Sequence, residues 1–356
     1  MIKLSTTRLC ARDLLKGFLN RFLRKEPIKE FEEAMAGFLK SRKCFAVSSG
    51  ENAFRLILKT LKRITGANRV IITPYLERRY LGVIEKEGLS CVSCGLVPFT
   101  VNPEPEALYK LSEKDTACVV MTHAFGIPVD MSELSHKLRQ KNIFMVEDCS
   151  RALGSYYYRY RVGSVGDISF TDFSPQANLN LVSGGCIMVN REELVNELEY
   201  ETRNLEFQGA LPEIKMFSKM LVNLFKSGGL NDSNSAAKIT RLQAAVGLSV
   251  LKNIFKKNVK RLYNGTFLME STKKNDRVSQ FMIPAYCKPV YNLLPLFILK
   301  EEDFLYVKKQ LAGEGIETGN YTGAGADKKK NIALFPAHEG LKEKGINRIA
   351  EVINSL

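Results

Sequence analysis

Histidine is scarce in this chain of 356 residues and occurs only at His123, His136 and His338. These positions are too scattered for a histidine triad or a metal site to be proposed. Among the eight cysteines, Cys91 and Cys94 form a close pair, but no second pair or nearby histidine completes a zinc ligand set. We therefore predict no metal centre.

The chain also lacks long apolar runs. No stretch approaches the roughly 20 apolar residues that a membrane-spanning helix needs, and the N-terminus has no signal-peptide core. The cysteines are spread along the chain, mostly in apolar segments such as the one around Cys118, which favours buried, reduced thiols. These absences predict a cytoplasmic globular protein.

What the sequence does contain is an alternation of strands and helices. Apolar segments at 69–73, 116–121 and 142–146 are typical of short buried strands, and helical patterns such as 131–140 separate them. This order predicts an α/β fold with a mostly parallel sheet, flanking helices and a ligand site at the carboxyl ends of the strands. Asp148 follows the third segment, where a ligand-facing residue is expected.

The pattern changes near residue 256. Beyond it come a helix, an apolar segment at 291–299, a second helix at 301–313 and a last helix near 342–353. The chain is long enough for a large domain and a smaller one. We predict a large α/β domain over residues 1–255 and a small C-terminal α+β domain over residues 256–356.

Residues 163–185 carry the strongest likeness to known proteins. They read Gly-Ser-Val-Gly-Asp-Ile-Ser-Phe-Thr-Asp-Phe-Ser-Pro-Gln-Ala-Asn-Leu-Asn-Leu-Val-Ser-Gly-Gly. This segment resembles the cofactor segment of the DegT/StrS sugar aminotransferases, fold-type-I enzymes that use pyridoxal phosphate (PLP). Other segments resemble landmarks of that family in the same order, at 30–50, 122–130, 146–154, 242–248 and 315–319 with Tyr321. The resemblance implies the fold-type-I PLP-transferase fold, but a shared fold does not establish function.

The resemblance also identifies a missing reagent. Aligned without a gap, the family's Schiff-base lysine falls on Ala177, and no lysine occurs between Asp148 and Asn190. That lysine binds PLP and then moves the substrate proton, so a methyl group removes both the nucleophile and the base. Asp148 stands at the position of the family's aspartate, which pairs with the pyridine nitrogen.

The resemblance places phosphate-binding groups at three further positions, which here hold Glu51, Asp172 and Ala236. The first two replace hydroxyl donors by carboxylates, which only accept hydrogen bonds. A phosphate about 4 Å from a carboxylate is destabilised by on the order of 4 kcal/mol per pair of charges. Two other pocket positions of the family hold Arg151 and Ser183. We expect no PLP and no other cofactor.

Asp148, Glu51 and Asp172 are expected to converge where the cofactor would lie. Buried charges of one sign are costly unless they are paired. We expect Arg151, the nearest cation in sequence, to bridge these carboxylates. The aromatic residue that stacks on PLP in the family aligns near 77–78, with Tyr80 as an alternative.

Positive charge is in excess, with 52 lysines and arginines against 38 acidic residues and a net charge of +14. Part of the excess lies in two candidate amphipathic helices, at 12–25 and 213–226. Such helices bind anionic membranes or dock partners. We favour the interpretation that their apolar stripes pack on the large domain or across a dimer. No motif for nucleic-acid binding accompanies the charge.

These observations predict a catalytically degenerate relative of the sugar aminotransferases. It would bind a ligand such as a nucleotide-linked sugar, or serve as a partner subunit, in sugar, polysaccharide or natural-product metabolism. Two alternatives stay open: an active PLP-dependent aminotransferase of a nucleotide-linked keto sugar, and PLP-independent chemistry in the remodelled acidic pocket. The resemblance implies a homodimer, or a heterodimer with a lysine-containing paralogue.

Overall fold

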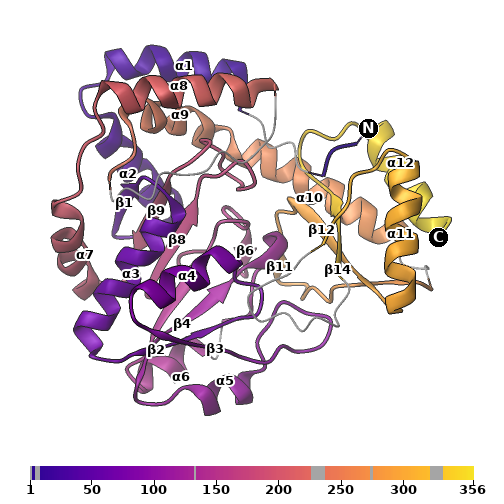
Figure 1. The fold of residues 1–356 in the computed structure, drawn as a ribbon, viewed down its shortest axis with the longest axis horizontal. Coiled ribbons are helices and arrows are strands. Elements are labelled where there is room, and N and C mark those ends of the chain that lie inside the picture. The colour runs from indigo at the N-terminus through magenta and orange to yellow at the C-terminus, as the bar shows by residue number, and fades with distance from the viewer. Residues whose placement is uncertain (1, 5–8, 132–133, 226–236, 273–275, 321–331) are drawn as a thin grey trace.

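A seven-stranded sheet forms the centre of the large part of the molecule (Figure 1). The computed structural model describes residues 2–4, 9–131, 134–225, 237–272, 276–320 and 332–356. Along the sheet the strands are β1 (Lys43–Val47), β9 (Gly185–Val189), β8 (Ile168–Asp172), β5 (Phe144–Asp148), β4 (Thr116–Thr122), β2 (Arg69–Ile72) and β3 (Ser90–Ser93). β9 is antiparallel to both of its neighbours, and the pairings from β8 to β3 are parallel.

Helices cover both faces of this sheet. β4 is buried along its whole length, and its side chains alternate between two apolar cores. Cys118 and Val120 face the core under α3, whereas Val119 and Met121 face the core that continues into the C-terminal part. Burial on both faces explains why this strand is mostly apolar instead of alternating with polar residues.

The helices of the large part are α1 (Ala11–Leu23), α2 (Pro27–Leu39), α3 (Gly50–Thr65), α4 (Arg78–Lys86), α5 (Pro105–Leu111), α6 (Leu134–Gln140), α7 (Glu193–Arg203), α8 (Ala210–Phe225) and α9 (Arg241–Lys252), with a 3-10 turn, η1 (Ala124–Gly126).

The C-terminal part has a sheet of its own, in the order β10-β12-β14-β13, with antiparallel pairings. Its elements are α10 (Ile254–Ser271), β10 (Val278–Gln280), β12 (Leu293–Ile298), α11 (Glu301–Gly313), β13 (Gly319–Asn320), β14 (Ile332–Pro336) and α12 (Glu343–Asn354). A third sheet joins β6 (Tyr156–Tyr157) and β7 (Tyr160–Arg161) to β11 (Cys287–Lys288), so a strand of the C-terminal part pairs with the large part. The N-terminus also reaches the C-terminal part, because Ile2 forms a bridge with Ile316.

The α/β fold with a large, mostly parallel sheet confirms the prediction from sequence. One apolar core runs from Met121 and Phe125 of the large part to Leu296 and Ile349 of the C-terminal part. The domain boundary at residue 255 stays a prediction. Cys91 and Cys94 differ in burial, and all eight cysteines are free thiols. Within the described residues, no helix combines the length and apolar character that crossing a membrane requires.

Candidate functional site

Two acidic residues mark the carboxyl edge of the large sheet. Asp148 ends β5 and Asp172 ends β8, and both side chains are buried. Ser150 links the two: its N–H donates to Asp148 Oδ1 at 3.0 Å, and its hydroxyl accepts the N–H of Asp172 at 3.1 Å. Burial raises the pKa of Asp148. Asp148 and Asp172, two of the three carboxylates expected to converge, therefore lie at the ends of neighbouring strands.

Asp172 lies against the N-terminus of α3. A Cβ atom on Gly50 would come within 2.4 Å of Asp172 Cβ, so only glycine fits this close approach. Ser49 caps the helix by accepting the N–H of Asn52 at 3.1 Å. A helix N-terminus favours negative charge, and here a carboxylate of the same chain lies beside it. Glu51 follows in the first turn of the same helix.

Arg79, near the start of α4, is the cation that Asp172 binds. Its guanidinium donates to Asp172 Oδ2 through Nη2 and to Glu77 Oε2 through Nε at 3.0 Å. Burial alone would lower the pKa of Arg79, but Tyr80 and the nearby Glu77, Glu51 and Asp148 raise it above its ordinary value. Of the three predicted carboxylates, Asp172 binds Arg79 directly, whereas Glu51 and Asp148 act on it only through their charge.

Arg151 binds a different carboxylate from those expected. Its Nη2 donates to Glu77 Oε1 at 2.7 Å and to Gln176 Oε1 at 2.8 Å. Burial alone would raise the pKa of Glu77, but the guanidinium groups of Arg151 and Arg79 lower it to about 2. The prediction that Arg151 bridges Asp148, Glu51 and Asp172 is therefore wrong. The result is a chain of ion pairs from Asp172 through Arg79 and Glu77 to Arg151, which we call the site network.

Sequence reasoning missed Glu77 and Arg79 as charged members of the site. The alignment indicated an aromatic residue there, with Tyr80 as the alternative. Tyr80 is fully buried, and its ring packs edge-on against Phe54 and Phe170 at centroid distances of 5.3 and 5.2 Å. Arg79 lies over its ring face at 4.7 Å. The signal available in the sequence was the Glu77-Arg78-Arg79 run itself, since charges placed where an apolar ring is expected need partners.

The loop between β8 and β9 contains two further predicted positions, Ala177 and Ser183. Ala177 is fully buried, and its N–H donates to the carbonyl of Ser174 at 2.9 Å. Ser183 accepts two bonds from Gln243 Nε2, at 2.8 Å to its carbonyl and 3.3 Å to its hydroxyl. Gln243 also completes the capping box of α9, so Ser183 helps to hold that helix. Ala236 lies outside the described residues.

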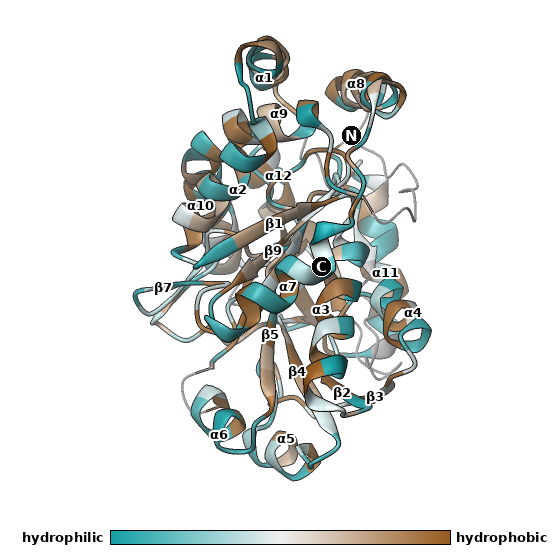
Figure 2. Ribbon diagram, turned by 90° about the vertical axis from the view of Figure 1, so that its left-hand side faces the viewer, coloured by the Kyte–Doolittle hydropathy of each residue, from teal (hydrophilic) through white to brown (hydrophobic). Residues whose placement is uncertain are grey.

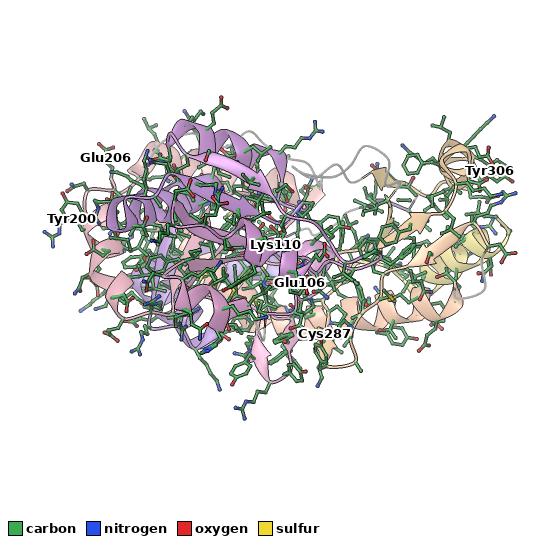
Figure 3. The ribbon with its side chains drawn as sticks, turned by 90° about the horizontal axis from the view of Figure 1, so that it is seen from below. Glu106, Lys110, Tyr200, Glu206, Cys287 and Tyr306 are labelled. Atoms are coloured by element: carbon green, nitrogen blue, oxygen red, sulfur yellow. The ribbon has the colours of Figure 1, made fainter. Side chains whose placement is uncertain are left out.

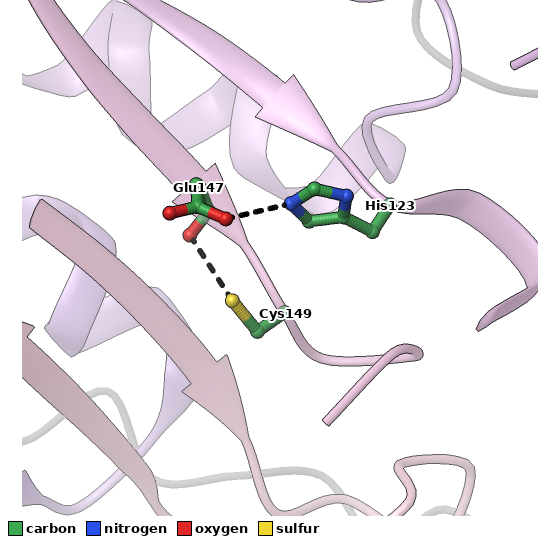
Figure 4. Close-up of side chains that lie close together, drawn as sticks. All are labelled: His123, Glu147 and Cys149. Carbon is green, nitrogen blue, oxygen red and sulfur yellow. Dashed lines mark hydrogen bonds and ion pairs between the residues drawn. The ribbon is translucent and has the colours of Figure 1, made fainter. Parts of the chain in front are cut away.

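A second buried cluster, close to the site, consists of His123, Glu147 and Cys149 (Figure 4). Its hydrogen bonds indicate a structural role. His123 Nδ1 accepts the N–H of Val129 at 3.0 Å, which leaves the proton on Nε2 to donate to Glu147 at 3.0 Å. Glu147 also accepts backbone N–H groups of the 163–166 turn. Both ring nitrogens are thus engaged. A metal ion between His123, Glu147 and Cys149 would have to displace one of these hydrogen bonds, so the cluster is better explained as a clamp on the turn.

A cavity of about 1320 Å³ lies at the other edge of the large sheet, lined in part by Thr116, Asn142 and Phe144. Thr116 and Phe144 are the first residues of β4 and β5. In open α/β sheets ligands bind at the carboxyl ends of the strands. This cavity lies at the amino ends of the strands, so we keep the site around Asp148 as the candidate ligand site.

The comparisons with known proteins agree with the fold. Solved structures of sugar aminotransferases have the same fold: CalS13 from Micromonospora echinospora has a TM-score of 0.82 at 20% identity over 100% of both chains. PseC from Helicobacter pylori, an aminotransferase involved in the biosynthesis of pseudoaminic acid, has a TM-score of 0.82 at 19% identity over 99% of this chain and 98% of that one.

Sequence comparison identifies the family. The model of the DegT/DnrJ/EryC1/StrS aminotransferase family matches residues 13–332, so the chain belongs to that family. GDP-perosamine synthase of Vibrio cholerae is 23% identical over 86% of this chain and 88% of its own length. The spore coat polysaccharide biosynthesis protein SpsC of Bacillus subtilis is 28% identical over 65% of this chain and 58% of its own length.

Proposed function

We propose that this chain is a non-catalytic member of the aminotransferase family, one that binds a ligand or partners another subunit in sugar or polysaccharide metabolism. The observation that carries the proposal is the site network. Ala177 replaces the reactive lysine, and the charges of Asp172 and Glu77 are balanced by arginines of the same chain. The pathway class comes from relatives such as the spore coat polysaccharide protein.

Position 177 holds alanine, which lacks the amine that transamination requires. The family reaction needs an amine that forms a Schiff base with PLP and then transfers a proton. A methyl group can do neither. Asp148 retains the carboxylate that would pair with the pyridine nitrogen, but burial raises its pKa and the aspartate alone supplies no nucleophile.

The residues present do not fit the phosphate of PLP either. The N-terminus of α3 would attract a phosphate, but Asp172 lies there and Glu51 follows in the first turn. A phosphate at this point would face two carboxylates, each worth on the order of 4 kcal/mol of repulsion at about 4 Å. It would also have to compete with Asp172 for Arg79. We infer that the chain does not retain PLP.

The test is a search for the covalent adduct. The purified protein is incubated with PLP, reduced with borohydride, digested and analysed by mass spectrometry, with a GDP-perosamine synthase treated in parallel as the positive control. We expect no pyridoxyl-lysine adduct on peptides of the site. A stoichiometric adduct there would contradict the proposal and favour the alternative of an active aminotransferase of a keto sugar.

We further propose that the chain forms the family's two-fold dimer, either with itself or with a lysine-containing paralogue. We predict that the helix containing residues 242–248 belongs to the part of the chain that approaches the partner. Residues 242–251 of α9 are buried within the single chain, so neighbouring elements would have to form the interface itself. A specific interface should bury more than roughly 1,000 Å². Sedimentation at micromolar concentration tests the homodimer, and a strict monomer contradicts it. Co-purification with an active paralogue, with a change in that paralogue's rate, supports the heterodimer.

A further inference from the structure

α1 and α8 lie side by side at one end of the molecule, above α9 (Figures 1 and 2). Two contacts hold them together: an ion pair between Arg21 and Glu213, and the rings of Phe18 and Phe217 with centroids 5.0 Å apart. Both helices are attached to the fold by small or apolar groups. Gly17 of α1 packs so closely on Val246 that a Cβ atom would come within 2.5 Å of it, and Met216 and Met220 of α8 are buried.

The outward sides of both helices are apolar, so these stripes are not fully covered by the large domain; packing across a dimer stays a prediction. In α1, Leu14 is buried, but Phe22 and Leu23 are 65% and 79% exposed. In α8, Phe225 is 79% exposed. Side chains three or four residues apart share a helix face, so these residues form an outward stripe on each helix. We call this surface the α1–α8 face; its large apolar members are Leu15, Leu19, Phe22, Leu23, Leu211, Ile214, Leu221, Val222 and Phe225.

The charges of the two helices are sorted by sign. Their acidic residues, Asp13 and Glu213, are buried against the protein: Asp13 accepts a bond from Asn253 at 2.9 Å, and Glu213 pairs with Arg21. Arg12, Lys16 and Lys215 are exposed. Among the described residues of α1 and α8, every solvent-exposed charged group is therefore basic. The apolar face is therefore bordered by exposed positive charge, and the described residues of its two helices include no exposed acid.

We propose that the α1–α8 face binds the surface of a membrane rich in anionic lipid. Interfacial helices combine an apolar face, which enters the boundary between headgroups and acyl chains, with lysine and arginine residues that contact anionic headgroups. The α1–α8 face has both features. A second copy of the chain fits this face less well, because two copies would bring the same basic border together. The binding would be peripheral, since the helices lie along the surface. This inference does not depend on the proposed loss of catalysis.

Vesicle binding tests the proposal with the full chain. Vesicles of phosphatidylcholine and phosphatidylglycerol in a two-to-one ratio are compared with vesicles of phosphatidylcholine alone, at low and high salt. We expect binding to the mixed vesicles, weaker binding at high salt and little binding to neutral vesicles. Equal binding to both vesicle types, or none to either, overturns the proposal.

Matched variants assign the binding to this face. Leu19→Ser with Phe22→Ser should weaken the partition to mixed vesicles by at least about tenfold. The control, Leu299→Ser with Leu305→Ser, removes two apolar side chains of the C-terminal part that are 50% and 76% exposed and should leave the partition unchanged. Figure 1 shows α11 at the end of the molecule away from α1 and α8, and in Figure 3 Tyr306 projects from α11 at the end opposite Tyr200 of α7.

Charge variants test the basic border separately. Lys16→Gln with Lys215→Gln should weaken binding by about tenfold at low salt, and Lys309→Gln with Lys344→Gln should not. Circular dichroism checks that each variant is folded. If the Leu19→Ser, Phe22→Ser protein binds vesicles like the unmodified chain, the face is not the membrane contact. If that variant instead changes the sedimenting mass and vesicles bind neither protein, the face is a protein interface and the proposal fails.

Discussion

At the carboxyl edge of the large sheet, Glu77 and Asp172 are charged groups with partners from their own chain. On the α1–α8 face, Phe22 and Phe225 are large apolar groups exposed to water. The first region is where we predict the ligand site of the family, yet the charges of its ion pairs are already balanced by groups of the same chain. The second region had no assigned role, yet its apolar surface has no cover within the described residues. The comparison indicates that the position of a site within a fold does not show whether it binds a ligand. Side chains that lack a partner in their own chain, whether charged or apolar, are the better guide.

Among changes to the site network, removal of Arg79 should produce the largest effect on stability. Arg79→Ala leaves Asp172, which is nearly fully buried, and Glu77 with less compensation. We expect the free energy of unfolding to fall by about 3 kcal/mol, because breaking a buried pair leaves an unpaired charge. Urea denaturation measures it. The control is the neighbouring, exposed Arg78→Ala, which should change the free energy by less than about 0.5 kcal/mol. Equal stabilities of the two variants would show that the site network is not a stabilising unit.

The second prediction concerns the pH dependence of the same network. The pKa of Glu77 is lowered from 4.5 to about 2 by Arg151 and Arg79, against the effect of burial. A lowered carboxyl pKa stabilises the fold above the unfolded value, and this stabilisation is lost as the pH falls through the folded value. Glu77→Gln should therefore be less stable than the unmodified chain near neutral pH, by on the order of 2 kcal/mol.

The difference should shrink between pH 4.5 and about 2. Asp148 acts with the opposite sign, because burial raises its pKa, but it is present in both proteins and does not affect their difference. Unfolding by urea at a series of pH values gives the curve. Glu106→Gln, at an exposed position in α5, is the control. A difference that stays constant with pH would mean that Glu77 is not held ionised by the arginines.

The smallest effect is expected on the α1–α8 face. Phe22→Ser removes an exposed ring, so the free energy of unfolding should change by less than about 0.5 kcal/mol. Leu14→Ala on the same helix should cost about 2–5 kcal/mol because Leu14 is 4% exposed. Thermal unfolding of the two variants compares them. A large loss of stability in Phe22→Ser would show that the ring packs within the fold, and the proposed membrane surface would lose its basis.

Local sequence patterns predicted much of the fold. The apolar segments at 69–73 and 116–121 are β2 and β4, and the predicted helix at 301–313 coincides with α11. These elements follow from periodicity because their faces are buried on one side or both. The position of Asp148 at a strand end was also predicted, since parallel strands place their carboxyl ends along one edge.

The partners within the site could not be predicted in the same way. Arg79 and Asp172 are 93 positions apart, and nothing in the local sequence specifies that they meet. Arg151 is three positions from Asp148, which made it the nearest cation in sequence but not in space. Likewise, periodicity showed that residues 12–25 form an amphipathic helix without showing which side faces the protein. Gly17 determines which side of α1 faces the protein, because the absence of a side chain there allows the helix to pack on Val246.

The central claim is that the chain's own carboxylates occupy the place of the cofactor phosphate. The most direct measurement is a titration with PLP of two variants, Ala177→Lys alone and Ala177→Lys combined with Glu51→Thr and Asp172→Ser. Lysine binding of PLP is followed by its absorbance, and circular dichroism checks the fold. The triple variant restores the amine and the hydroxyl donors, and it releases Arg79 from Asp172 to bind phosphate. We predict that the triple variant binds PLP and that Ala177→Lys alone does not. If folded Ala177→Lys binds PLP as tightly as the triple variant, the carboxylates do not exclude the phosphate and the account is contradicted.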